Sequence, residues 1–187
     1  MTDDYRAADV KGTPHLDAES FKAAFRNHPG GVAVITADAG DGPVGMTVTS
    51  VCSVSADPPL LAFSVSDLSS SAPTILRAES VVVHLLDSLD QPIAVLCSTS
   101  GVDRFADAEQ WSTLDTGEPY FRGVNVALRC GIDARVRAGT ATVIVVRALS
   151  AVSSREADSG GAPLVYHGRT WHALSDRSRV DAPPAVA

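Results

Sequence analysis

The stretch GMTVTSVCSVSADPPL, residues 45–60, mixes small hydroxylated residues with apolar ones and ends at a double proline. Successive side chains of a β-strand point to opposite faces, so a strand over 44–54 carries hydroxyl and apolar groups on both faces. A strand that only covers a core separates the two kinds of residue more cleanly. We interpret this strand either as a Thr- and Ser-rich edge strand or as one whose backbone approaches a flat polar ligand, with Gly45 leaving room beside it.

Other apolar β-branched runs flank this stretch and are separated by turn signals. They predict strands over 32–36, 60–65, 81–86, 124–136, 140–152, 164–166 and 170–174. Short helices are expected over 16–27, 69–77 and 91–96. Strands and helices do not alternate regularly, which argues against a doubly wound parallel sheet. The expected fold is therefore mainly β, an antiparallel barrel with inserted helices.

Size and charge narrow the class of protein. The chain has 187 residues, a formal net charge of -7 and 15 Lys and Arg residues, which are scattered along it. One domain is expected over 16–175, with flexible segments at 1–15 and 176–187. Because the cations are scattered and the net charge is negative, the chain lacks the basic patch that nucleic-acid binding normally requires, and no nucleic-acid partner is expected. No apolar run approaches the roughly 20 residues of a membrane-spanning helix, so no membrane contact is expected.

The cysteines and the start of the chain indicate the compartment. Cys52, Cys97 and Cys130 are widely spaced and form no CxxC pair, so we interpret them as small buried thiols. The first fifteen residues lack the apolar segment of a secretory signal. A reducing cytoplasm is the expected location.

Common catalytic motifs are missing. The sequence has no G-x-S-x-G elbow, no HExxH motif and no Walker loop. Its five histidines include no pair spaced three or four residues apart, so no metal site is predicted. His84 lies within an apolar run and is interpreted as a hydrogen-bonded core or interface residue.

A cluster of hydroxyl groups marks the start of the predicted helix at 69–77. Ser69, Ser70, Ser71 and Thr74 lie where free backbone N–H groups and hydroxyls can hold a phosphate without Lys or Arg. Together with the strand over 44–54, this cluster indicates a ligand with a ring system at one end and a phosphate at the other. Flavin mononucleotide (FMN) has that shape.

On these residues the sequence resembles the flavin reductase-like family with an FMN-binding split barrel, the small reductase components of two-component flavin monooxygenases. The similarity covers about residues 17–175. Its most specific parts are Gly45 to Ser50 and Ser53 to Leu60. The other matching segments are Gly31 to Thr36, Asp103-Arg104-Phe105, Gly117-Glu118-Pro119, Leu128-Arg129-Cys130 and Pro163 to Gly168.

The resemblance implies a homodimeric split barrel that binds FMN or FAD near the subunit interface. The cofactor-binding residues that it implies are Gly45, Met46, Thr47, Val48, Thr49, Ser50, Ser53, Val54, Ser55, Ser69, Ser70, Ser71, Thr74, Arg104 and Phe105. The first nine would line the isoalloxazine, the next four would hold ribityl and phosphate, and the last two would edge the cofactor. No side-chain acid or base is required, because the flavin carries the hydride chemistry.

Two positions depart from the family pattern. Thr49 stands where the family usually has Asn. Gly139-Thr140-Ala141 stands where it commonly has Gly-Asp-His, and that histidine is associated with the nicotinamide side of the flavin. Tyr166 or His167 could supply the partner that Ala141 does not.

The implied function is an NAD(P)H:flavin oxidoreductase that supplies reduced flavin to a separate oxygenase, with NADH or NADPH as co-substrate. One alternative is a flavin carrier or sensor of the same fold, favoured by Ala141. Another is a flavin-dependent oxidoreductase acting on a different small substrate, with residues 106–117 as a lid.

Overall fold

The fold is mainly β, and the computed structural model describes residues 14–152 and 160–180 of the chain. The helices are α1 (Ala18–Arg26), α2 (Ala72–Arg77) and α3 (Gln91–Ser98), with 3₁₀ turns η1 (Ser88–Asp90) and η2 (Asp176–Ser178). The strands are β1 (Gly30–Gly31), β2 (Ala33–Ala37), β3 (Val44–Val48), β4 (Cys52–Ala56), β5 (Pro59–Ser66), β6 (Ser80–Leu85), β7 (Trp111–Thr113), β8 (Pro119–Phe121), β9 (Val126–Ala138), β10 (Ala141–Val152), β11 (Leu164–His167) and β12 (Thr170–Ala173). No helix of the described residues is long and apolar enough to cross a membrane.

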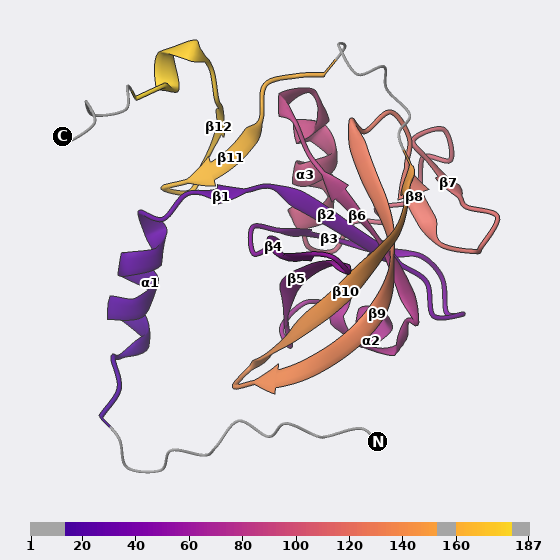
Figure 1. The fold of residues 1–187 in the computed structure, drawn as a ribbon, viewed down its shortest axis with the longest axis horizontal. Helices are drawn as coiled ribbons and strands as arrows, with labels where there is room; N and C mark the ends of the chain where they lie inside the picture. Colours follow the sequence, from indigo (N-terminus) through magenta and orange to yellow (C-terminus); the bar gives the residue numbers. More distant parts are fainter. Residues whose placement is uncertain (1–13, 153–159, 181–187) are drawn as a thin grey trace.

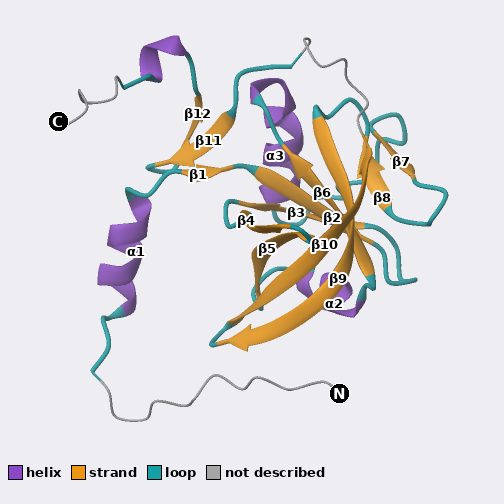
Figure 2. Cartoon of the chain, in the orientation of Figure 1, coloured by secondary structure: helices purple, strands orange, loops and turns teal. Residues whose placement is uncertain are grey.

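Seven antiparallel strands form the main sheet, in the order β3-β2-β6-β9-β10-β5-β4. Consecutive strands β3 and β4 therefore lie at opposite edges of the sheet, although only residues 49–51 connect them. So short a connection requires the sheet to curl until its edges face one another, because three residues span at most about 10 Å. The 49–51 loop crosses the split between these edges, and the expectation of a split antiparallel barrel is confirmed (Figure 2).

The expectation of one continuous strand over 44–54 is wrong. β3 pairs with β2 up to Val48, and β4 pairs with β5 from Cys52 onward. Pairing with two different partners breaks the extended run at Thr49, and a register shift between Ser53 and Ser55 interrupts β4 again. The alternation of side chains between the two faces of a strand is therefore not continuous from Thr47 to Ser53.

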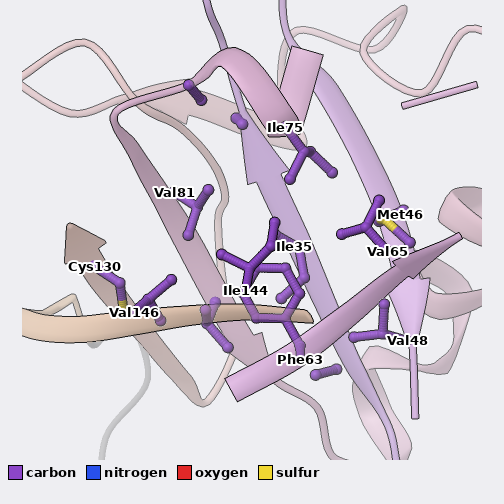
Figure 3. Packing of buried hydrophobic residues seen from close by; sticks show 14 of the residues in the cluster. Ile35, Met46, Val48, Phe63, Val65, Ile75, Val81, Cys130, Ile144 and Val146 are labelled. Carbon is purple, nitrogen blue, oxygen red and sulfur yellow. The ribbon is translucent and has the colours of Figure 1, made fainter. Parts of the chain in front are cut away.

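The core fills the inside of the curled sheet. Ile35, Phe63, Val65 and Ile144 are at most 1% exposed and come from β2, β5 and β10 (Figure 3). Each such side chain contributes roughly 1.5–3 kcal/mol relative to an exposed one. Ile75 of α2 enters the same cluster and closes one end of it.

Helix ends follow the sequence signals. Asp17 is the N-cap of α1 and accepts the backbone N–H groups of Glu19 and Ser20, each at 3.0 Å. Such a cap contributes about 1 kcal/mol. α1 nevertheless buries none of its residues and stands apart from the barrel in Figure 1. Its apolar face carries Phe21 and Phe25, both more than half exposed.

A two-stranded ribbon, β7–β8, lies in the stretch that showed little periodicity. Trp111 on β7 donates its indole N–H to the carbonyl of Phe105 at 2.9 Å, and Phe121 on β8 is 1% exposed. Residues 106–117 therefore include the strand β7, and their role as a lid stays a prediction. Short strands of three residues carry too few alternations for a sequence pattern to show.

The terminal hairpin β11–β12 joins β1 in a separate three-stranded sheet. This hairpin is confirmed, whereas the two-glycine strand β1 was not predicted. Within the expected tail at 176–187, residues 176–178 form the turn η2. The remainder of that tail from 181, and positions 1–13 of the expected N-terminal segment, lie outside the described residues.

Candidate flavin site at the split of the barrel

The loop across the split, Thr49-Ser50-Val51, exposes its backbone. Thr49 and Ser50 are exposed. Among the residues that the structure describes, no partner accepts the backbone N–H of Thr49, Ser50 or Val51. The Ser50 hydroxyl instead fixes the loop, since its oxygen accepts the Ser64 N–H at 3.0 Å. The loop therefore presents fixed main-chain donors to a ligand.

The side chains of β3 are engaged within the protein on both faces of the strand. Met46 and Val48 belong to the core cluster, and the Thr47 hydroxyl donates to the carbonyl of Ala94 at 2.6 Å. The side chains of these three residues therefore serve the fold. A ligand at this strand meets the backbone that follows Val48.

Gly45 is closely covered, in contrast to the expectation that it leaves an approach open. A β-carbon at this position would lie 3.2 Å from the Cys97 sulfur and 3.6 Å from the Phe105 ring. Burial raises the pKa of the Cys97 thiol to about 12, so this sulfur stays protonated. A larger side chain here would press on the Cys97 sulfur, because α3 and the loop of Phe105 pack directly against β3.

The serine cluster divides into buried and open hydroxyls. Ser71 is 1% exposed and donates to the carbonyl of Gly45 at 2.9 Å, while Thr74 is 6% exposed and donates to Asp41 at 3.3 Å. Both hydroxyls are thus engaged within the protein. Ser69 is half-buried and accepts the Ser71 N–H at 3.3 Å, and Ser70 is exposed. Ser69 and Ser70 are the members of the cluster left to face a phosphate.

Arg104 and Phe105 lie beside the same strand. They line a pocket of about 120 Å³ together with Pro43, Val44, Gly45, Val102 and Asp103. The Arg104 Nη2 donates to the carbonyl of Thr99 at 3.0 Å, whereas its buried Nε atom has no partner among the described residues. An unsatisfied buried donor is costly, which favours an acceptor on a ligand here.

The second edge strand, β4, borders an apolar hollow. Ser53 and Val54 are exposed and Ser55 is half-buried. The hollow has a volume of about 260 Å³ and is lined by Val51, Ser53, Ser55, Pro59, Leu60, Leu61, Leu85, Leu128 and Ala148. The 49–51 loop thus carries polar donors at the border of an apolar surface, which suits a flat ring with polar and apolar edges. Cys52, expected to be buried, is exposed on this strand.

The structure does not bring Ala141 together with Tyr166 and His167. Ala141 begins β10 and pairs with Ser66 in the main sheet. Tyr166 pairs with Gly30 in the three-stranded sheet, and both Tyr166 and His167 line a pocket with Thr49. The three residues expected on the nicotinamide side therefore occupy two separate places within one protomer.

Sequence reasoning missed several supporting residues. Cys97 and Asp41 hold β3 and α2 in place, and Trp111 fixes Phe105. A single buried cysteine and an aspartate in a turn belong to no sequence motif, so the sequence gives no signal for either. Among the described residues, no group of three or more His, Cys, Asp or Glu side chains lies together as a metal site.

A curled antiparallel sheet with main-chain donors exposed across its split has the architecture expected of an FMN-binding split barrel. Residues 25–175 match the family described as Flavin reductase like domain, so the chain belongs to that family. It is 40% identical over 163 residues to an NADH:FMN oxidoreductase from Rhodococcus qingshengii, covering 85% of each chain.

Solved structures show the same fold. A flavin reductase domain protein from Arthrobacter sp. FB24 superimposes with a TM-score of 0.79 and 30% identity, over 88% of this chain and 98% of its own. BorF, the flavin reductase component of a bacterial two-component tryptophan halogenase, gives a TM-score of 0.73 and 29% identity, over 86% and 100% of the two chains. These similarities extend over nearly the whole described domain.

Proposed function

We propose that the protein is an NAD(P)H:flavin oxidoreductase that binds FMN or FAD across the 49–51 loop. The observation that carries the proposal is the row of backbone N–H groups on Thr49, Ser50 and Val51, which find no partner within the part of the chain that the structure describes. Such donors can bond the carbonyl oxygens of the flavin pyrimidine ring. The 40% identity to an NADH:FMN oxidoreductase supports the same activity.

The residues present fit a flavin. The loop amides would hold the pyrimidine edge, and the hydroxyls of Ser69 and Ser70 with the Ser70 N–H, which has no partner among the described residues, would hold the phosphate end. The unpartnered Arg104 Nε would find an acceptor at the edge of the cofactor. When bound, the flavin supplies the hydride-accepting chemistry, while the chain's part is to fix the ring and to limit the access of water.

The active unit is proposed to be a homodimer. The hollow beside the 49–51 loop is lined by Leu60, Leu85 and Leu128, and Leu85 is 39% exposed. Exposed apolar surface of this kind is typical of subunit contacts. A second copy over the hollow would cover it and shield a flavin on the loop from water.

A separate flavin-consuming enzyme is the proposed recipient of the product. BorF is a component of a two-component halogenase system. By similarity, this chain would pass reduced flavin to an oxygenase or a related enzyme encoded as a second protein.

A second candidate function, flavin carriage or sensing without efficient reduction, is favoured by Ala141. Its methyl side chain at the start of β10 has no group that can hydrogen-bond a nicotinamide. The site would then bind flavin in the same way but lack a partner for the reductant.

The deciding experiment measures flavin-dependent oxidation of NADH and NADPH by the purified protein at 340 nm, with FMN, FAD or riboflavin added. We expect turnover well above the protein-free rate. Binding of flavin, followed by its visible absorbance, without nucleotide oxidation would refute the reductase and support the carrier.

Replacement of Ser70 by alanine tests the phosphate end of the site. A hydrogen bond to a charged group contributes about 1.5–3 kcal/mol, so the Kd for FMN should rise about 10-fold or more. Riboflavin lacks the phosphate, and its Kd should not change. Ser98→Ala, an exposed serine whose hydroxyl bonds its own helix, is the matched control. Equal losses for FMN and riboflavin would contradict the phosphate assignment.

A further inference from the structure

A cationic pocket lies between α1 and the β11–β12 hairpin. Its volume is about 240 Å³, and it is lined by Lys22, Phe25, Arg26, His28, Thr49, Tyr166, His167, Gly168 and Arg169. No acidic residue contributes to this lining. The pocket is locally basic in a chain whose formal net charge is -7.

The guanidinium groups in this pocket are free to meet an anion. Lys22 is paired with Glu19 at 2.8 Å, but neither Arg26 nor Arg169 has an acidic partner among the described residues. Arg26 lies in the last turn of α1, where the helix dipole places roughly half a negative elementary charge. That partial charge is smaller than the two positive charges of the arginines, so the pocket remains an anion-attracting surface.

Arg169 holds an unfavourable backbone conformation at the rim of the pocket. Its φ is 67°, the only positive φ of a non-glycine residue among those described, and Gly168 before it has a φ of 57°. Two successive positive φ angles define a type I′ hairpin turn, which favours glycine at its second position. An arginine costs about 1 kcal/mol or more there, and such strain is concentrated at functional sites.

The walls of the pocket are tied to each other. The Gly168 N–H donates to the carbonyl of Arg26 at 3.1 Å, which joins the hairpin turn to the end of α1. On the other side, a β-carbon at Gly30 would lie 2.8 Å from the Cβ of Thr49, so β1 packs directly against the 49–51 loop. The cationic pocket is therefore held immediately beside the loop proposed to carry the flavin ring.

We propose that the cationic pocket binds the diphosphate group of the nicotinamide dinucleotide, whose nicotinamide ring would meet the flavin held on the 49–51 loop. This inference rests on the proposed function and names the part of the substrate that its site recognises outside the ring. Arg26 and Arg169 would each bond phosphate oxygens, as guanidinium groups do in a two-pronged geometry. FAD is not the source, because its diphosphate includes the flavin phosphate that the proposed site places at Ser69 and Ser70.

The test variant is Arg169→Gly, which removes the guanidinium and also relieves the positive φ. Its fold should be retained, with an unchanged or raised melting temperature. We expect kcat/KM for NADH to fall about 10-fold or more, by the loss of one charge-assisted contact. Reduced nicotinamide mononucleotide lacks a diphosphate and should lose much less, and the Kd for FAD should change little. A loss confined to FAD binding would contradict the inference.

Arg177→Gln is the control, because it removes an exposed positive charge on η2, outside the pocket. Arg26→Gln should repeat the effect of Arg169→Gly. Calorimetric titration with ADP provides a readout without turnover, and both pocket variants should weaken ADP binding while the control does not. Unchanged NADH and ADP parameters in Arg169→Gly would overturn the inference. Absence of turnover in the wild-type protein, with ADP binding intact, would refute only the proposed reductase.

Discussion

Replacement of Glu118 by alanine is expected to lower the free energy of unfolding by about 3 kcal/mol. Glu118 is 4% exposed and accepts hydrogen bonds from Ser80, Thr116 and, at 2.8 Å, from Arg129 Nε. Removing one partner of a buried ion pair leaves the other charge uncompensated, which costs about 3–5 kcal/mol. The lower limit applies because the Arg129 side chain is 24% exposed and can regain some water.

The matched control is Asp133→Ala, which breaks the ion pair between Asp133 and Arg147 on the surface. Exposed pairs contribute about 0–1 kcal/mol, so this variant should remain close to wild type. Urea unfolding of the three proteins measures the difference. A Glu118→Ala protein no less stable than Asp133→Ala would show that the buried network contributes nothing.

The ionisation of Glu118 adds a pH dependence. Burial opposes its charge, but the hydrogen bonds from Ser80 and Thr116 and the charge of Arg129 outweigh burial and hold its pKa below the ordinary 4.5. A lowered carboxyl pKa contributes stability above the ordinary value, and that contribution is lost as the pH falls through the folded-state pKa. The stability difference between wild type and Glu118→Ala should therefore shrink below pH 4.5.

Much of the fold was predictable from local signals. β2 follows from its β-branched run, and it is buried at every position. The start of α1 follows from the side-chain oxygen of Asp17, which needs no tertiary contact to cap a helix. The β9–β10 hairpin follows from two long apolar segments around Gly139, whose φ is 61°. In each case the decisive interaction joins residues close in sequence.

The parts that sequence could not supply depend on distant partners. β3 ends before Thr49 because β3 and β4 pair at opposite edges of the sheet. The topology of the sheet decides this end, and the local propensity of the residues does not. Ser71 is engaged because it meets the carbonyl of Gly45, 26 residues away. The cationic pocket joins Arg26 to Arg169, which only the contact between α1 and the hairpin turn brings together.

The second large effect concerns His84, which should make the protein lose about 2 kcal/mol of stability between pH 7 and pH 5. His84 is fully buried, and desolvation lowers its pKa from 6.5 to about 4. Its Nδ1 lies 3.1 Å from the carbonyl of Val34, and its Nε2 accepts the N–H of Phe121 at 3.1 Å. This pair of contacts requires the neutral ring with its proton on Nδ1.

The sign follows from the two protonation states. Above pH 6.5 the imidazole is neutral in both the folded and the unfolded chain, and the full stability is present. Below pH 6.5 the unfolded chain takes up a proton that the folded chain does not bind until about pH 4, so stability falls across this interval. The window from pH 7 to pH 5 lies above the titration of Glu118, which keeps the two effects apart.

Comparison with His84→Leu isolates this contribution. The variant should be less stable at pH 7, because the Val34 carbonyl and the Phe121 N–H lose their partner. Its unfolding free energy should nevertheless fall less steeply between pH 7 and pH 5, since no buried imidazole remains to titrate. Parallel slopes for the two proteins in urea titrations at each pH would show that His84 does not hold its neutral form. A steeper wild-type slope would identify the neutral ring of His84, which contacts Val34 of β2 and Phe121 of β8, as the group whose protonation destabilises the fold in this interval.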